Sequence, residues 1–227
     1  MKKILFILTT NLFLIACSAS ENKIEPVLKH EEFFGFEITD ISKRSGVSLT
    51  GYEFQTVDGK NISINRCKQA ITLNVANIAE FDYFRFNLLL LSCNAFDKYT
   101  HAKASKTSYF PTEFKADFFS QLPADVTPLI NSTDKSQRQN KTLLDYDKNT
   151  KTIMETPRTA KLLTAEDEIY ITLLARGDFN ADGIEDLLLK SEWFSRNAFG
   201  KHADLLIISK SDKDAIASIN WRLKPIK

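Results

Sequence analysis

The sequence predicts an α+β fold, in which an N-terminal β-hairpin and a long helix pack with a C-terminal antiparallel sheet. Three patterns carry this prediction. Apolar and polar residues alternate on both sides of Asp58-Gly59, apolar residues recur every three or four positions over 79–103, and short apolar runs separated by polar turns follow residue 142. Alternation is typical of strands, and a spacing of three and four is typical of a helix.

The hairpin is predicted from two alternating runs that flank a turn sequence. Its strands are Leu49–Val57 and Lys60–Asn65, and the Asp58-Gly59 pair between them suits the positive φ angles of a type I′ turn. Ala70–Val75 also alternates, so a third strand is predicted there.

The long helix is predicted over Ala79–Lys103, because its apolar residues form a stripe at helical spacing. We expect this helix to be buried on most of its surface and to carry Cys93 inward. A shorter helix is predicted at Thr112–Gln121, with Thr112 as its cap and Leu122-Pro123 after its end. The stripe of the long helix consists of Phe81, Phe84, Leu88, Leu91 and Ala95.

The rest of the chain is predicted to be mostly strands. Asn131–Asn140 has nothing apolar to bury and is predicted to be an exposed loop. The apolar runs that follow it are short and closely spaced, which is typical of an antiparallel sheet. The predicted strands are Thr142–Tyr146, Thr152–Glu155, Ile169–Ala175, Asp186–Phe194, Ala203–Ser209 and Ala217–Leu223.

Composition and charge exclude several classes of protein. The 227 residues are 43% hydrophobic and 11% aromatic, as expected for a globular chain that buries a core. Seven glycines and six prolines exclude collagen-like and low-complexity chains. The chain has 30 basic and 29 acidic residues, and loss of Lys2 and Lys3 with residues 1–16 leaves a mature charge of about −1. Because no basic stripe is present either, we expect no nucleic-acid binding.

The first residues have the pattern of an export signal. Met1-Lys2-Lys3 is positive, Ile4–Ile15 is apolar but too short to span about 30 Å of hydrocarbon, and Leu14-Ile15-Ala16-Cys17 follows. This arrangement resembles the bacterial lipoprotein signal, whose cysteine is acylated and becomes the first residue of the mature protein. By that resemblance Cys17 carries the lipid, and Ser18 stands where an acidic residue usually marks inner-membrane retention. The resemblance therefore implies the outer membrane of a Gram-negative envelope.

The predicted organisation follows from this signal. Residues 1–16 form the signal peptide, 17–32 a lipidated tether, and 33–227 one globular domain with a hairpin and helix part over 33–130 and a β part over 142–227. Two or three acyl chains hold a protein on a membrane for practical purposes permanently, so the protein is expected to sit on the membrane without crossing it. The alternative is an ordinary secretory signal that is cut near Ala16 or Ala19.

The remaining cysteines form an even pair. With Cys17 lipidated, Cys67 and Cys93 are left in an oxidising compartment, where structural disulfides persist. We predict a disulfide between them that joins the end of the hairpin to the long helix. Two buried free thiols are an alternative, whereas a metal site would lack ligands because no histidine is near in sequence.

One motif carries metal chemistry. Residues 177–187 contain Asp-x-Asn-x-Asp-Gly-x-x-Asp, and Ca²⁺ requires six to eight oxygen ligands, which a tight loop can supply from alternate side chains. Gly183 permits the sharp turn. An EF-hand is excluded because the position of its bidentate glutamate is Leu189. The alternative is an aspartate-rich turn whose carboxylates accept N–H groups of their own loop. The expected ligands are Asp178, Asn180, Asp182, the Ile184 carbonyl and Asp186.

The segment around this motif resembles a known repeat. Gly-Asp-Phe-Asn-x-Asp-Gly-x-x-Asp-Leu, with strands predicted on both sides, is similar to the FG-GAP or VCBS-type repeat of integrin propellers and many bacterial surface proteins. The likeness covers about 35 residues, Leu174–Ser209, and implies that the same five positions bind calcium. A propeller needs several such repeats, and the chain has one.

No recognisable catalytic set is present, so the leading expectation is a non-enzymatic lipoprotein that binds another envelope protein. An immunity or inhibitor lipoprotein that blocks a toxin or hydrolase is one form of this function. The competing class is a periplasmic hydrolase of envelope polymers, which needs carboxylates such as Glu166, Asp167 or Glu192 to converge in a cleft. Trp193, Phe194 and Phe199, which bracket Arg196, are interpreted as core packing, with an aromatic contact patch as the alternative.

Overall fold

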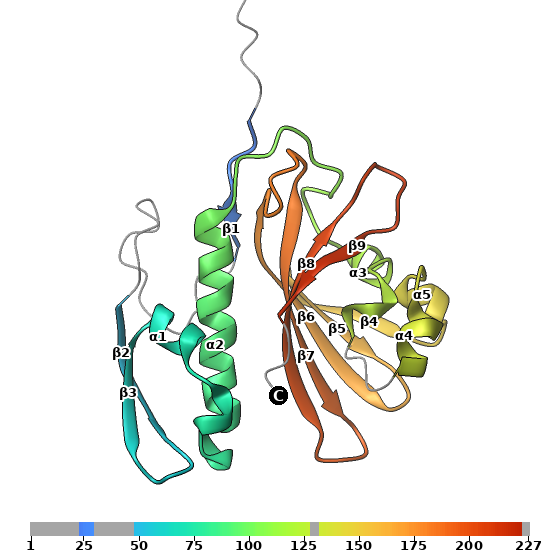
Figure 1. Cartoon of the computed structure of the whole chain (residues 1–227). Helices are drawn as coiled ribbons and strands as arrows, with labels where there is room; N and C mark the ends of the chain where they lie inside the picture. The colour runs from blue at the N-terminus through green and yellow to red at the C-terminus, as the bar shows by residue number, and fades with distance from the viewer. Residues whose placement is uncertain (1–22, 30–47, 128–131, 224–227) are drawn as a thin grey trace, which may run out of the picture.

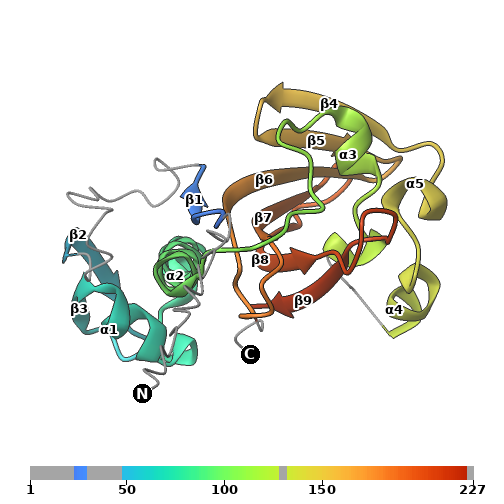
Figure 2. The same ribbon diagram turned by 90° about the horizontal axis from the view of Figure 1, so that it is seen from above.

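The computed structural model describes residues 23–29, 48–127 and 132–223. It contains helices and a large antiparallel sheet, so the predicted α+β class is confirmed. The elements form four layers: a β-hairpin, one long helix, a sheet of seven strands and a group of short helices (Figures 1 and 2). None of the helices in these three ranges is long and apolar enough to cross a membrane.

The sheet is an antiparallel meander in the order β4-β5-β6-β7-β8-β9. β1 (Val27–Leu28) pairs with β6 beyond the end of β5. The sequence predicted five of the six meander strands and missed β5, a short strand that contains Thr159 and Lys161. The six strands are β4 Lys151–Thr156, β5 Thr159–Leu163, β6 Asp167–Gly177, β7 Asp186–Ser195, β8 Lys201–Ser209 and β9 Ser218–Arg222.

The two faces of the sheet bury separate cores, because successive side chains of a strand point to opposite faces. Ile171 and Leu189 belong to the core shared with the short helices, whereas Leu174, Leu188 and Leu205 belong to the core shared with α2 (Glu80–His101). The Nζ atom of Lys201 on β8 lies 3.8 Å from the ring centre of Phe84 on α2. The sheet is therefore covered on both faces.

The predicted hairpin is confirmed as β2 (Ser48–Gln55) and β3 (Asn61–Arg66), but its turn is not type I′. Gly59 has a φ of +80°, whereas Asp58 does not have positive φ. The Thr56 amide donates to the Lys60 carbonyl (2.8 Å), so the loop has three residues and places its glycine in the left-handed position. This arrangement keeps the twist of the strands with only one residue at positive φ.

The region between the hairpin and the long helix is helical, so the strand predicted at Ala70–Val75 is wrong. α1 (Cys67–Thr72) and η3 (Val75–Asn77) occupy it. The side chain of Gln69 accepts the backbone N–H groups of Asn65 and Arg66 (2.9 and 3.0 Å) and thereby starts a helix directly after β3. The long helix predicted over 79–103 is confirmed as α2.

The short elements after α2 differ most from the predictions. The helix predicted at Thr112–Gln121 is present only as α3 (Ala116–Ser120), with Lys115 instead of Thr112 at its N-cap. The loop predicted over 131–140 is wrong, because α4 (Ser132–Arg138) forms there. The strand predicted at 142–146 is also wrong, because Thr142 and Asp145 form a capping box that begins α5 (Leu143–Tyr146). A further single turn, η4 (Ala124–Val126), packs against α5.

Residues 23–29 lie on the domain, although they fall within the predicted tether. Ile24 and Ser105 exchange two backbone hydrogen bonds of 2.7 and 2.9 Å, and Pro26 is buried. Gly177 permits this contact, because a Cβ atom at that position would lie 3.1 Å from both Pro26 and Ala102. The domain therefore extends at least to residue 23, ten residues before the predicted boundary at 33.

Candidate functional site

The predicted cysteine pair forms a disulfide. Cys67 begins α1 and Cys93 lies in α2, so the bond joins two helices, whereas the sequence predicted a link from the hairpin to the helix. Cys93 is fully buried beside Phe54 and Phe86, whose rings meet edge to face at 5.2 Å in the core of the N-terminal part. The proposed lipidation site, Cys17, lies outside the described residues.

The acidic loop, residues 178–185, connects β6 to β7 as predicted from the flanking strands. It lies at the end of the molecule where α2 finishes, beside the segment that follows α2 (Figure 1). Lys103 exchanges two backbone hydrogen bonds with Asp178 (2.8 and 3.1 Å), and the Lys106 amide donates to the Gly183 carbonyl at 2.7 Å. The segment that follows α2 therefore holds the loop through these backbone hydrogen bonds.

The oxygens of the predicted calcium ligands accept hydrogen bonds from their own loop. Asp178 accepts the amides of Asp182 and Gly183 (3.2 and 2.8 Å), Asp182 accepts the amide of Ile184 (2.7 Å), and Asn180 accepts the amide of Asp182 (3.0 Å). This is the geometry of the aspartate-rich turn. Within the described ranges, no three acidic, histidine or cysteine side chains converge as a metal cluster. The donor types suit Ca²⁺, but this arrangement of them does not form a cage.

Asp186, the first residue of β7, is a fully buried carboxylate directly after the loop. Its oxygens accept the hydroxyl of Ser209 and the amide of Phe179 (3.0 Å). Burial raises the pKa of the Asp186 carboxyl to about 6, the negative charges of Asp182 and Asp178 act in the same direction, and the two hydrogen bonds oppose the rise. The loop therefore carries negative charge that its own donors only partly compensate.

A buried ion pair lies next to the acidic loop and was not predicted. Arg176 and Glu185 approach to 2.5 Å, and their side chains are only 8% and 4% exposed. The Ser108 hydroxyl also donates to Glu185 (2.5 Å), and Arg176 donates to the Pro111 carbonyl (2.7 Å). The pair thereby fastens the segment that follows α2 to the sheet.

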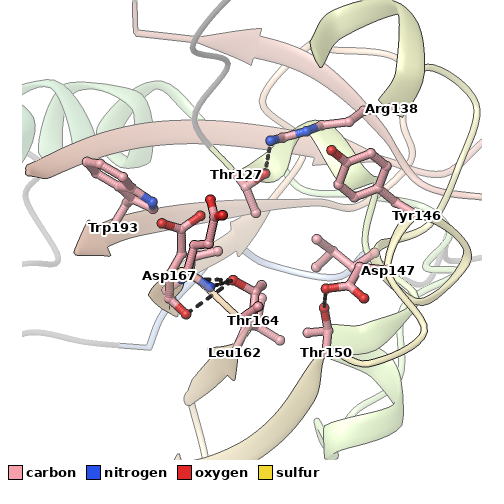
Figure 3. A pocket seen from close by; sticks show the side chains of 13 residues that line it. Thr127, Arg138, Tyr146, Asp147, Thr150, Leu162, Thr164, Asp167 and Trp193 are labelled. Atoms are coloured by element: carbon pink, nitrogen blue, oxygen red, sulfur yellow. Dashed lines mark hydrogen bonds between the residues drawn. The ribbon is translucent and has the colours of Figure 1, made fainter. Parts of the chain in front are cut away.

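A pocket of about 350 Å³ opens between the β5–β6 turn and the short helices α4 and α5 (Figure 3). Its apolar floor is formed by Leu143, Leu162 and Ile169. Trp193 on β7 forms one wall, because it lies directly across the strand pair from Ile169. The polar residues that line the pocket are Thr127, Arg138, Tyr146, Asp147, Thr150, Thr164, Glu166 and Asp167.

The pocket walls are held in place by contacts outside the pocket as well as within it. Arg138 donates to the Thr127 hydroxyl, and its guanidinium carbon lies 5.0 Å from the centre of the Tyr146 ring. On the opposite side, a Cβ atom at Gly200 would lie 2.7 Å from the Trp193 ring, so the indole packs directly on the backbone of the β7–β8 turn. The helices α4 and α5 thus position one side of the pocket, and the β7–β8 turn positions the other.

The acids proposed for a hydrolase are only partly brought together. Glu166 and Asp167 line the pocket and are joined there by Asp147, which the sequence analysis did not single out. Glu192 is not part of its lining and forms an ion pair with Lys190 at 2.7 Å. In the part of the chain that the structure describes, the carboxylates of Glu166 and Asp167 have no ion-pair or hydrogen-bond partner.

Four exposed apolar side chains lie at one end of the molecule, which we call the aromatic end and define by Val57, Phe81, Phe194 and Phe199. Val57 is 69% exposed, Phe81 is 73% exposed, and Phe199 is completely exposed. They lie at the hairpin tip, at the start of α2 and in the β7–β8 turn, which Figure 1 shows at the end opposite residue 23. Phe194 and Phe199 are therefore exposed, so the core-packing interpretation is wrong for them, whereas Trp193 packs against the core.

Comparison with known proteins gives no relative: no family model matches the chain, and no curated protein and no solved structure is significantly similar to it.

Proposed function

We propose that the protein is a lipid-anchored, non-enzymatic envelope lipoprotein that binds another envelope protein through its aromatic end. The observation that carries this proposal is that Phe199, Phe81 and Val57, the three most exposed large apolar side chains of the described residues, all lie at one end of the domain. Large exposed apolar groups that gather on a surface mark interaction sites, whereas isolated ones need no explanation. The partner is another envelope protein, and if it is an incoming toxin or hydrolase, this protein is an immunity or inhibitor lipoprotein.

The proposed lipid anchor at Cys17 would place the aromatic end away from the membrane. Between Cys17 and Lys23 the chain can reach at most about 21 Å. Acylation of Cys17 would therefore hold the residue-23 end of the domain close to the bilayer. The 22-residue helix α2 is about 33 Å long and runs from the aromatic end to that end. The aromatic end would then face away from the membrane, toward other proteins.

The disulfide supports an oxidising compartment. Such bonds form and persist in the periplasm and outside the cell, and they are rare in the cytosol. The Cys67–Cys93 bond joins two buried elements of one core, which is typical of a structural disulfide. It is thus consistent with export.

We include Ca²⁺ in this proposal as a structural ion that binds at the acidic loop. Each carboxylate oxygen of Asp178 and Asp186 accepts one hydrogen bond and keeps a second lone pair, and the buried charge of Asp186 favours a nearby cation. When bound, Ca²⁺ would neutralise part of this charge. The protein would supply the loop that holds the ion, and backbone hydrogen bonds from the segment 103–107 keep this loop in place.

Two experiments test the proposal. In detergent phase separation, the full chain is expected in the detergent phase and Cys17→Ser in the aqueous phase. In the envelope, a photo-crosslinking amino acid at position 81 is expected to yield a discrete adduct that Val57→Ser weakens. The same probe at exposed Ile153, on the edge strand β4, is the matched control. Identical adducts from positions 81 and 153, or none from 81, would contradict binding through the aromatic end.

A hydrolase is the second candidate, because Asp147 and Asp167 lie on different sides of one pocket (Figure 3). Glycosidases place two carboxyl groups on either side of the bond that they cleave. Digestion of envelope polysaccharide by the purified protein, with loss of activity in Asp147→Asn and in Asp167→Asn, would favour this function. Undiminished activity in both variants would exclude this pocket as its site.

A further inference from the structure

The pocket beneath the β5–β6 turn combines an acidic rim, an aromatic wall and an apolar floor. We propose that it receives one basic side chain, an arginine or a lysine, of the partner protein. This inference rests on the proposed partner-binding function and names the group that the partner supplies.

The charges that line the pocket favour a cation. Three carboxylates, those of Asp147, Glu166 and Asp167, face one guanidinium, that of Arg138. Arg138 lies against Thr127 and Tyr146, on the side of the pocket away from Trp193 (Figure 3). The formal charge of the lining residues is therefore −2, and an anionic ligand would be repelled.

The acids beside Trp193 are available to a ligand. Asp147 accepts hydrogen bonds from the Asn149 amide and the Thr150 hydroxyl (2.9 and 3.1 Å). By contrast, no described residue donates to the carboxylates of Glu166 or Asp167. Arg196, a base outside the lining, donates its amide to the Glu166 carbonyl and its guanidinium to the Thr164 carbonyl (3.1 Å). These backbone contacts hold the turn while its side-chain carboxylates stay unpaired.

The apolar surfaces match the rest of a basic side chain. Lysine and arginine bury an aliphatic stem along apolar surface and keep their charged head near polar groups. Leu162 and Ile169 provide such a surface on the floor of the pocket. The face of Trp193 is suited to a cation, because tryptophan forms the strongest cation–π contacts among the aromatic residues. A neutral ligand would gain from the floor and the indole but not from the two unpaired acids.

The pocket lies next to one part of the proposed interface. Trp193 is followed by Phe194, which points to the opposite face of β7, and then by the β7–β8 turn that carries Phe199, so the indole wall adjoins the turn that belongs to the aromatic end. Gly200 keeps the indole in position, since any side chain there would overlap the ring. A partner seated on the aromatic end could therefore insert one side chain into the pocket.

The test uses the folded full-length protein and short peptides. The chain has two tryptophans, and Trp221→Phe leaves Trp193 as the single tryptophan, whose emission is excited selectively above the absorption of tyrosine. The probes are acetyl-Gly-Arg-Gly-amide, its lysine counterpart and the citrulline peptide, which has the shape of arginine without its charge. We expect saturable changes in Trp193 emission with the arginine and lysine peptides and at least tenfold weaker binding of the citrulline peptide.

Charge variants locate the binding. Glu166→Gln and Asp167→Asn are expected to weaken arginine binding several-fold, whereas Glu155→Gln, an exposed acid on the edge strand β4, should not change it. Gly200→Ala tests the aromatic wall and should weaken binding without any change in charge. Circular dichroism and melting curves verify that each variant is folded.

Three results would overturn the inference: equal affinity for the arginine and citrulline peptides, equal affinity of the wild type and both acid variants, or no saturable response at about 10 mM peptide. These outcomes are independent of the crosslinking at position 81. Peptide binding without a crosslink would contradict the proposed function, and a crosslink without peptide binding would contradict the pocket alone.

Discussion

Replacement of Glu185 by glutamine is expected to destabilise the protein strongly. Glu185→Gln keeps the shape of the side chain but leaves the buried guanidinium of Arg176 without its counter-charge. A charge pair at about 4 Å gains about 4 kcal/mol at an effective dielectric constant of about 20, and removal of one partner of a buried pair costs about 3 to 5 kcal/mol. For a chain of this length we expect the melting temperature to fall by roughly 10 °C.

The measurement is chemical denaturation of wild type and variant at neutral pH, supported by thermal melts. Asp58→Asn is the matched control, because Asp58 and Lys60 form an ion pair of similar length (2.6 Å) whose members are mostly exposed. Exposed pairs contribute about 0 to 1 kcal/mol, so this control should hardly change the free energy of unfolding.

A double variant separates the charge from the packing. Arg176→Met with Glu185→Leu removes both charges together and should recover much of the loss caused by Glu185→Gln, because replacement of a whole buried pair by apolar groups is often close to neutral. If Glu185→Gln were as mild as Asp58→Asn, the pair would not fasten the segment that follows α2 to the sheet, and the structural account of this region would be wrong.

Three further predictions concern the disulfide and the acidic loop. Cys67→Ser with Cys93→Ser should lower the free energy of unfolding by about 3.5 kcal/mol in the chain-entropy picture, and added reductant should lower the melting temperature of the wild type but not of this variant. Because the pKa of Asp186 is about 6 in the folded protein and 3.8 in the reference state, the folded state binds more protons between these values. In chelator, the contribution of Asp186 to stability should therefore decline as the pH rises from about 4 to above 6, and Asp186→Asn should remove this part of the pH profile. Calcium at about ten times its dissociation constant should stabilise the wild type by about 1.4 kcal/mol, whereas Asp182→Ala should melt alike with calcium and with chelator; equal melting of the wild type in both would remove calcium from the proposal.

The long, strongly periodic elements could be predicted from the sequence. The alternation of the hairpin, the apolar runs of β6 to β8 and the helical spacing in α2 each extend over many residues, although Phe81 of the predicted α2 stripe is 73% exposed. The presence of a hairpin and of a helix follows from such patterns, whereas the register of this hairpin does not, because its loop has three residues instead of the predicted two. The α+β class was therefore accessible without coordinates.

The short elements could not be predicted, because single side chains determine them. Gln69 starts α1 through two hydrogen bonds, although the next residues alternate like a strand. Thr142 and Asp145 begin α5 in the same way. In segments of four to six residues, a cap outweighs a weak pattern. The capping signal at Thr142 was present in the sequence, whereas the pairing of Val27–Leu28 with β6 depends on contacts more than 140 residues apart.

The candidate pocket depends on one further feature that no sequence pattern shows. Gly177 pairs with Asp186, and uninterrupted pairing along β6 and β7 from there would place Phe194 opposite Ile169. A bulge between Leu173 and Ala175 adds one residue to β6 and shifts the register, so Trp193 lies opposite Ile169 instead. Opposed residues share a face of the sheet, and for this reason the indole and the floor of the pocket meet on one side. The pocket could thus be found only once the pairing of the two strands was known.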